Sequence, residues 1–202
     1  ESQNFTSATD NYNVAVGFHA GTSITTGTNN TLVGGLVGDA ITTALGSTAV
    51  GQGALTTLQT GNSNTAIGYG AGESMNGVGS NTVVGAAALD GACGQHNTVV
   101  GASAMGSSNS TDAAGNTAIG RAAGFEITSG ANNIALGEDA LRTGSPGGSQ
   151  STGDNKIGLG DENITSFHCQ VALTVASDQR DKTDFVDLDL GLDFVKALEP
   201  VT

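Results

Sequence analysis

Several residue types that mark common classes of protein are scarce in this sequence of 202 residues. There is no tryptophan, aromatic residues make up 4%, and charged residues make up 12% against about 25% in ordinary soluble domains. Only two prolines accompany 32 glycines, which excludes collagen, because its triple helix needs abundant proline and glycine at every third position. No apolar run reaches the length of about 18 residues that a membrane span needs, so we expect no membrane insertion.

Basic residues are also scarce. Six Lys and Arg face 19 Asp and Glu, giving a net charge of −13. Nucleic acid is therefore excluded as a partner, because neutralising phosphates requires clustered Lys and Arg. The charge is uneven: residues 1–153 hold nine acids and two bases, and residues 154–202 hold ten acids and four bases. This shift predicts a boundary near Gly153 and Asp154.

The side chains that usually bind metals or cofactors form no recognisable pattern. Cys93 and Cys169 are far apart and make no C-x-x-C, so we interpret them as small buried or half-buried thiols. The three histidines fall at unrelated positions, and no Gly-Lys dipeptide exists from which a phosphate-binding loop could be built. We expect no cofactor and no metal site.

What the sequence does contain is a repeat. An Asn, three mostly apolar residues and a Gly recur, with a Ser in place of the Asn in one copy. The copies are Asn13–Gly17, Asn30–Gly34, Ser47–Gly51, Asn64–Gly68, Asn81–Gly85, Asn97–Gly101, Asn116–Gly120 and Asn133–Gly137. Their starts are separated by 17, 17, 17, 17, 16, 19 and 17 residues, and a degenerate ninth copy begins 22 residues later, at Asn155. Such a period predicts a solenoid, in which stacked coils share one core.

Each copy is expected to form a strand of about five residues, a glycine bend, a second short strand and a polar return loop. The third residue after the Asn is always a branched apolar one, and we call this set the branched column. Because successive side chains of a strand point to opposite faces of the sheet, the branched column lies on one face, and a column of mostly small residues, one position earlier, lies on the other. A second small column, mostly Ala, lies seven residues after the Asn. These two small columns predict a second packing surface that close approach of three chains fills. The Gly is expected to permit a bend or a close backbone approach, and the Asn to take a left-handed or capped turn and to form a ladder.

The run NTAIG-x-x-A-G and its variants, from Asn13 to Gly160, resemble the head repeats of YadA-like trimeric adhesins and of related phage tail fibres. The resemblance implies an all-β, left-handed parallel β-roll of about eight repeats that packs as a homotrimer. It predicts residues 1–12 as an N-terminal lead-in and residues 13–160 as the repeats.

The sequence changes character after the repeats. Residues 164–175 are β-prone, so we expect residues 161–176 to be a β-strand connector. Residues 177–182 indicate a capped, solvated turn. Residues 188–198 are typical of a short amphipathic helix, stopped by Pro200.

The string Ala176-SDQRDK, followed by LGLDFVKALEPV, is similar to the start of the intramolecular chaperone that ends many phage tail fibres and tail spikes of the endosialidase type. The resemblance implies that residues 177–202 are the truncated beginning of a chaperone that trimerises the fibre and then cuts itself off. The scissile bond is then Ala176–Ser177, with Ser177 as nucleophile and Lys182 as base. A neighbouring amine of lowered pKa activates a Ser hydroxyl. This is one self-cleavage, without turnover of an external substrate.

These observations predict a structural and host-recognition protein, the distal part of a phage tail fibre in the virion tail, assembled in the host cytoplasm. Its partners would be two further copies, other tail proteins and a host cell-surface receptor, either polysaccharide or outer-membrane protein. The candidate contact loops are residues 107–112 and 143–152. One alternative is the head of a bacterial trimeric autotransporter adhesin on the bacterial cell surface, and another is a protein whose essential activity is the Ser177–Lys182 peptidase.

Overall fold

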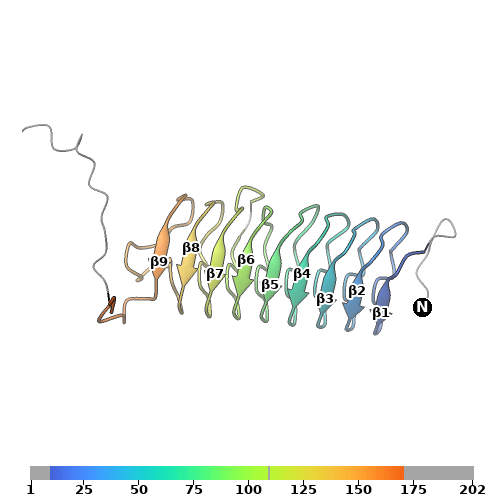
Figure 1. Ribbon diagram of the computed structural model, residues 1–202, viewed down its shortest axis with the longest axis horizontal. Helices are drawn as coiled ribbons and strands as arrows, with labels where there is room; N and C mark the ends of the chain where they lie inside the picture. Colours follow the sequence, from blue (N-terminus) through green and yellow to red (C-terminus); the bar gives the residue numbers. More distant parts are fainter. Residues whose placement is uncertain (1–9, 109, 171–202) are drawn as a thin grey trace, which may run out of the picture. The chain divides into compact units, whose positions relative to one another are not determined.

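A computed structural model describes residues 10–108 and 110–170, and these residues form a parallel β-solenoid with one strand in each coil (Figure 1). The strands are β1 (Val14–Val16), β2 (Thr31–Val33), β3 (Thr48–Val50), β4 (Thr65–Ile67), β5 (Thr82–Val84), β6 (Thr98–Val100), β7 (Thr117–Ile119), β8 (Ile134–Leu136) and β9 (Ile157–Leu159). They lie in sequence order in a single sheet, and every neighbouring pair is parallel. The described residues contain no helix. The predicted all-β solenoid is confirmed, and at about 4.8 Å per coil the nine strands span on the order of 40 Å.

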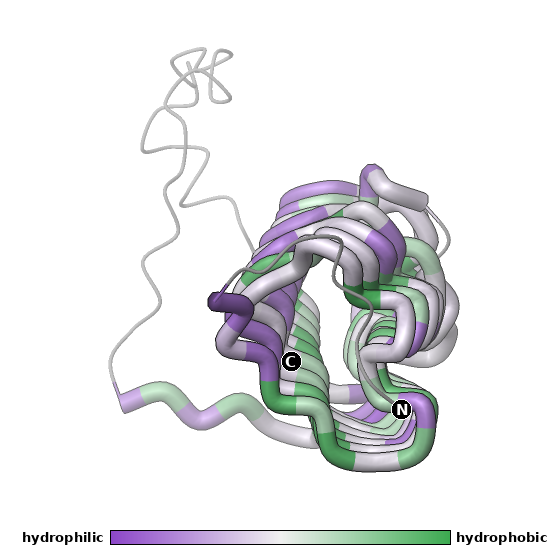
Figure 2. The backbone as a smooth tube through the Cα atoms, turned by 90° about the vertical axis from the view of Figure 1, so that its right-hand side faces the viewer, coloured by the Kyte–Doolittle hydropathy of each residue, from purple (hydrophilic) through white to green (hydrophobic). Residues whose placement is uncertain are grey.

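The repeat sets the register of the stack. Thr48 pairs with Thr65, and Ala49 with Ala66, so equal positions of successive copies lie over one another. Viewed along the stack, the coils superpose and residues of similar hydropathy line up from coil to coil (Figure 2). The register also survives the intervals of 16 and 19 residues, because the loops absorb the difference.

The ninth copy is in a different register from the one the sequence predicts. Ile134 pairs with Ile157, so Lys156 and not Asn155 takes the position of the repeat Asn. Asn155 has a left-handed backbone with a φ of 57°, like the residue before the repeat Asn in other coils, such as Asn132. Asn155 therefore takes the position before the repeat Asn, and the register is shifted by one residue.

The strands are shorter than predicted, at three residues, and the second strand of each coil is absent from the described part except for an isolated bridge at Ala92. The chain after the glycine forms turns instead. Left-handed backbone occurs there six and eight residues after the Asn, at Leu36 and Gly38 in the second coil and at Ser103 and Met105 in the sixth. Such residues prevent an extended strand. The turns nonetheless bond to the next coil, as in the hydrogen bond of 2.9 Å that Gly38 N donates to Ala54 O.

Within most strands, the middle residue faces the core and the branched column faces solvent. Ala49, Ala66 and Ala118 are fully buried, whereas Ile67 and Ile119 are 41% and 43% exposed. The alanines seven residues after the Asn, from Ala20 to Ala140, are also buried inside the chain. The two small columns therefore fill the solenoid's own core, and the prediction that they form a second packing surface is wrong. The outward surface of the sheet carries branched residues instead.

Core volume is balanced between positions of the coil. Where the eighth residue after the Asn is Gly, the space next to it is filled by a large side chain three residues later, namely Ile24, Ile41, Met75 or Ile127. A Cβ on Gly72, for example, would lie 2.7 Å from the Met75 sulfur. Leu32 extends from its strand toward both Gly21 and Gly38, and Gly158 gives room to Leu141. This exchange explains why a narrow core tolerates residues as different as Gly and Leu at one repeat position.

The glycine that ends each strand is required for two reasons. Gly85 has a φ of 142°, and a Cβ there would lie 2.4 Å from the carbonyl oxygen of Gly101 in the next coil. The equivalent glycines from Gly17 to Gly120 show the same approach, with Cβ to oxygen distances of 2.2–2.5 Å. Both predicted roles, the bend and the close backbone approach, are confirmed.

The repeat asparagines form the predicted ladder. Asn116 Oδ1 accepts a hydrogen bond of 2.9 Å from the backbone N–H of Asn133, and Asn116 Nδ2 donates one of 2.9 Å to the Gly130 carbonyl. The N–H of Asn116 in turn donates to Asn97 Oδ1 at 2.9 Å. These amides are buried, and they satisfy backbone groups that lie away from water. The left-handed residue is the one before the Asn, such as Asn132 with a φ of 57°.

Two natural deviations mark weak places in the ladder. Ser47 Oγ accepts a long hydrogen bond of 3.4 Å from Asn64 N. In other coils the Asn side chain also donates to a carbonyl 14 residues later, as Asn116 does to Gly130, but the shorter Ser47 side chain makes no such bond to Gly61. Lys156 N donates to Asn133 Oδ1 at 2.9 Å, but the Lys side chain has no acceptor for a following coil. The ladder therefore ends at Lys156.

The chain divides into two compact units, residues 1–165 and 166–202. The first unit holds the solenoid and ends close to the predicted end of the repeats at Gly160. The predicted connector contains no strand as far as Gln170, and its remaining residues 171–176 lie outside the described part of the chain, as do most of the lead-in and the predicted helix of residues 188–198.

Candidate functional site

The predicted cleavage site cannot be placed in the fold. Ser177, Lys182 and the Ala176–Ser177 bond lie outside the described residues. Their assignment stays a prediction from the sequence, and the described surface of the solenoid is where an interaction site can be sought.

The outward face of the sheet carries a column of apolar side chains along the stack. The branched column continues from Val16 in β1 to Leu159 in β9, and most of its members are at least 36% exposed. Val84 and Val100 are half-buried. Thr precedes the buried residue in six of the nine strands, and no strand residue carries a charge. This face is therefore an uncharged ridge along the whole stack.

The first predicted contact loop, residues 107–112, is described except for residue 109, and its first two residues are bonded to the next coil. Ser108 is buried, and its hydroxyl donates a hydrogen bond of 3.1 Å to the Ile127 carbonyl. Ser107 N donates to Phe125 O at 3.1 Å, and Asp112 N donates to Ser110 Oγ at 3.1 Å. Asp112 itself is exposed, so the loop presents a carboxylate from a fixed base.

The second predicted loop, residues 143–152, is anchored by Glu126 of the preceding coil. Glu126 Oε2 accepts hydrogen bonds of 3.0 Å from both the backbone N–H and the hydroxyl of Thr143. The hydrogen bond from Ser149, with these from Thr143 and the charge of Arg142, lowers the pKa of the Glu126 carboxyl below its usual value, against an opposing effect of burial. Glu126 therefore holds the loop most firmly when ionised.

Charged side chains pair between the seventh and eighth coils. Arg121 contacts Glu138 and lies 3.3 Å from Asp139, and these partners raise the pKa of its guanidinium. Arg142 lies 2.5 Å from Asp139 and is stacked 5.0 Å from the centroid of the Phe125 ring. Arg121 and Glu138 are largely exposed, so their ion pair contributes little to stability, whereas Asp139 and Arg142 are half-buried.

The side chains that could hold a metal ion are scattered in the described part of the chain. No group of three or more His, Cys, Asp or Glu side chains comes together there. Cys93 is buried as predicted, and burial raises the pKa of its thiol to about 12, so it is a poor nucleophile. Cys169 is exposed, so the prediction of a buried or half-buried thiol is wrong there. Among the described residues, no helix has the length and hydropathy to span a bilayer.

Comparison of the chain with protein-family models, with curated proteins and with solved structures gives no match. The resemblance to adhesin heads and phage fibres thus depends on the repeat and on the S-D-x-R-x-K string alone.

Proposed function

We propose that the chain is a structural and host-recognition protein, the distal part of a phage tail fibre that associates as a homotrimer and attaches to a bacterial cell surface. The observation that carries this proposal is the exposed branched column. Monomeric soluble proteins rarely leave a continuous apolar surface of this length open to water. Association of the strand faces of three parallel chains would bury it.

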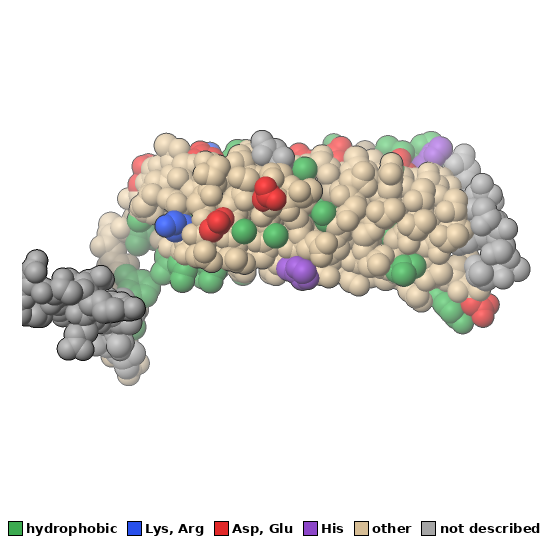
Figure 3. All heavy atoms as spheres, turned by 90° about the horizontal axis from the view of Figure 1, so that it is seen from above, with side chains coloured by type: hydrophobic (Ala, Val, Ile, Leu, Met, Phe, Trp, Pro, Cys, Tyr) green, Lys and Arg blue, Asp and Glu red, His purple; other side chains and the backbone are tan. Residues whose placement is uncertain are grey.

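The charge distribution supports association through this face and not another. Each chain carries a net charge of −13, so three chains repel one another at close range. The strand residues of β1 to β9 carry no charge, and the acidic side chains of residues 10–108 and 110–170 lie in the turns and loops. On the face seen in Figure 3, a few charged side chains are scattered among backbone and other, uncharged side chains. Packing through the strand face keeps like charges apart.

Such a rod would bind its target through many weak contacts. Three identical chains present each loop three times, and linked sites raise the overall affinity through effective concentration. The loops at residues 107–112 and 143–152 lie in the sixth and eighth coils, after β6 and β8, and are held by hydrogen bonds, which lowers the entropy lost on binding.

The native mass of the chain tests the proposal. We expect a trimer at micromolar concentration, and a monomer when Ile67→Asp and Ile119→Asp are combined, because six buried carboxylates would then meet at the interface. Leu45→Asp is the matched control for the single variant Ile67→Asp, because each adds one carboxylate, and the replaced side chains are 42% and 41% exposed. A monomeric wild type, or equal dissociation in the control, refutes the proposed assembly.

The adhesin head remains the alternative, since it shares the repeat. A longer gene product that carries the complete chaperone separates the two. A fibre is expected to be shortened at Ala176–Ser177, and Ser177→Ala is expected to block the cut while leaving the trimer intact. A wild type that stays uncut contradicts the self-cleavage.

A further inference from the structure

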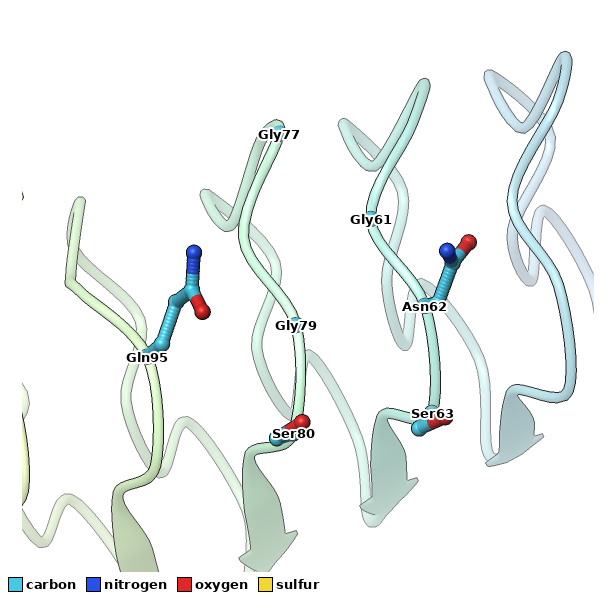
Figure 4. A pocket seen from close by; sticks show the side chains of 7 residues that line it. All are labelled: Gly61, Asn62, Ser63, Gly77, Gly79, Ser80 and Gln95. Carbon is cyan, nitrogen blue, oxygen red and sulfur yellow. The ribbon is translucent and has the colours of Figure 1, made fainter.

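A polar groove crosses three successive coils, in the segments that lead into β4, β5 and β6 (Figure 4). Its volume is about 330 Å³, which is at the lower end of the range of roughly 300–1,000 Å³ typical of ligand pockets. Three glycines line it, Gly61, Gly77 and Gly79. Four polar residues complete the lining, Asn62, Ser63, Ser80 and Gln95.

The groove exists because one side chain is missing from a column. Two residues before the repeat Asn, the three coils carry Asn62, Gly79 and Gln95 in turn. A Cβ on Gly79 would lie 2.6 Å from the Asn62 carbonyl oxygen, so the stacking of the coils requires glycine there. The Gln95 side chain leans toward the coil that contains Gly77 and Gly79 (Figure 4). The Asn62 side chain also leans toward its own preceding coil, where its Oδ1 accepts a hydrogen bond from Leu45 N, so the position at Gly79 between the two side chains is open (Figure 4).

The lining has unused hydrogen-bonding capacity. Within the described part of the chain, the side chains of Ser63, Ser80 and Gln95 make no hydrogen bond. Asn62 Oδ1 accepts a hydrogen bond of 2.9 Å from Leu45 N, and its Nδ2 has no acceptor. Two hydroxyls and two amides are therefore available as donors, and the hydroxyls and the Gln95 amide also as acceptors.

The backbone under these groups is fixed before any ligand arrives. Ser63 N donates to Leu45 O at 2.9 Å, and Ser80 N donates to Asn62 O at 2.9 Å. These bonds join consecutive coils, so the serines hold a constant spacing of about 4.8 Å per coil. A ligand that matches this spacing loses little affinity to ordering the protein.

The chemistry of the lining selects the ligand. It has no cationic side chain to neutralise an anion, no carboxylate to hold a cation, and no apolar side chain to bury that of a peptide. A ligand that carries uncharged hydroxyl groups, which both donate and accept hydrogen bonds, matches the polar groups of this lining. We propose that the groove binds a segment of a neutral oligosaccharide; this inference rests on the proposed role in attachment to a cell surface and names the ligand class.

The test is titration of the ¹⁵N-labelled chain with neutral hexasaccharides of glucose, mannose and galactose, and in parallel with hexagalacturonate. We expect saturable shifts of the Ser63 and Ser80 amides with at least one neutral sugar and none with the anionic one. Gln95→Ala is expected to weaken this binding about three- to tenfold, the effect of one lost uncharged hydrogen bond. Gln59→Ala, an exposed loop glutamine outside the groove, is the matched control and should bind as the wild type does.

The proposal is overturned if none of the neutral sugars shifts these amides, if hexagalacturonate binds as tightly, or if Gln95→Ala binds as the wild type does. The native mass and attachment to cells are measured separately. A trimer that attaches to cells but shows no groove shifts refutes the groove alone. A monomer that binds a neutral sugar in the groove supports the site and refutes the fibre assembly.

Discussion

Replacing one ladder asparagine by alanine tests how the coils are held together. In Asn116→Ala, the N–H of Asn133 loses its acceptor and the Gly130 carbonyl loses its donor, both at 2.9 Å and in a buried region. Each orphaned backbone group costs about 1–3 kcal/mol. The two together predict a loss of about 3–4 kcal/mol, a large share of the 5–15 kcal/mol that stabilises a typical domain.

The assay is urea unfolding followed by circular dichroism, with linear extrapolation to zero denaturant at a fixed protein concentration. The control is Asn76→Ala, because Asn76 is an exposed loop amide that accepts one long hydrogen bond of 3.3 Å from Gln59 N. We expect a change below about 0.5 kcal/mol in the control. If the free energy of unfolding of Asn116→Ala falls by no more than that of the control, water replaces the amide, and the asparagine ladder does not stabilise the stack of coils.

Further predictions concern the strand-ending glycine, the ladder and one loop. Gly85→Ala is expected to cost about 2–4 kcal/mol more than Gly147→Ala in the same unfolding assay, because an added Cβ meets a carbonyl at 2.4 Å at the first position and nothing within 4 Å at the second. Ser47→Asn is expected to stabilise by about 1 kcal/mol by completing the ladder, and an unchanged or lower urea midpoint would show that the site has no room for the amide. The pKa of Glu126 is lowered in the folded chain. The ionised carboxylate therefore stabilises the fold at pH values above the usual pKa of a Glu, and this stabilisation is lost as the pH falls through the lowered pKa. Amide exchange at Thr143, corrected for intrinsic rates, should therefore accelerate in acid, and a pH-independent corrected rate would contradict the anchoring role of Glu126.

The sequence predicted the features that depend on spacing. A recurring Asn-x-x-x-Gly is enough to indicate stacked coils, and the pairing of Ala49 with Ala66 follows from the period alone. The role of the strand-ending glycine also follows, since no other residue combines freedom at positive φ with the absence of a Cβ.

The sequence did not reveal which face of the strand is buried. Alternation separates Ala66 from Ile67, but both are apolar, and the usual expectation that the larger side chain is buried is wrong here. The inner residue can be as small as Ala66 where the opposite wall of the coil fills the core, as Met75 does beside Gly72, and as large as Leu32 where glycines stand opposite. That arrangement depends on contacts across the coil, which periodicity within one strand cannot show.

The candidate groove was missed for a related reason. Its signal is the replacement of an amide by Gly79 between Asn62 and Gln95, one residue in a column that lies outside the strand motif. Such a gap becomes visible only when the return loops are also aligned by coil. The position is easily overlooked in a chain with 32 glycines, most of which have other roles.

Scaffold and surface therefore occupy different positions in each coil. The ladder Asn, the strand-ending Gly and the inner Ala are fixed by contacts with the next coil, whereas the residue that follows the glycine is Phe18, Tyr69, Arg121 or Glu138 in different copies. In a solenoid, stability is close to a sum over neighbouring coils, so a change at such an outward position affects only the coils beside it. Recognition can thus change coil by coil without loss of the fold. Identity among the repeats marks the residues that hold the rod together, and the positions that vary between copies, such as the residue after the strand-ending glycine, are those that can change without loss of the fold.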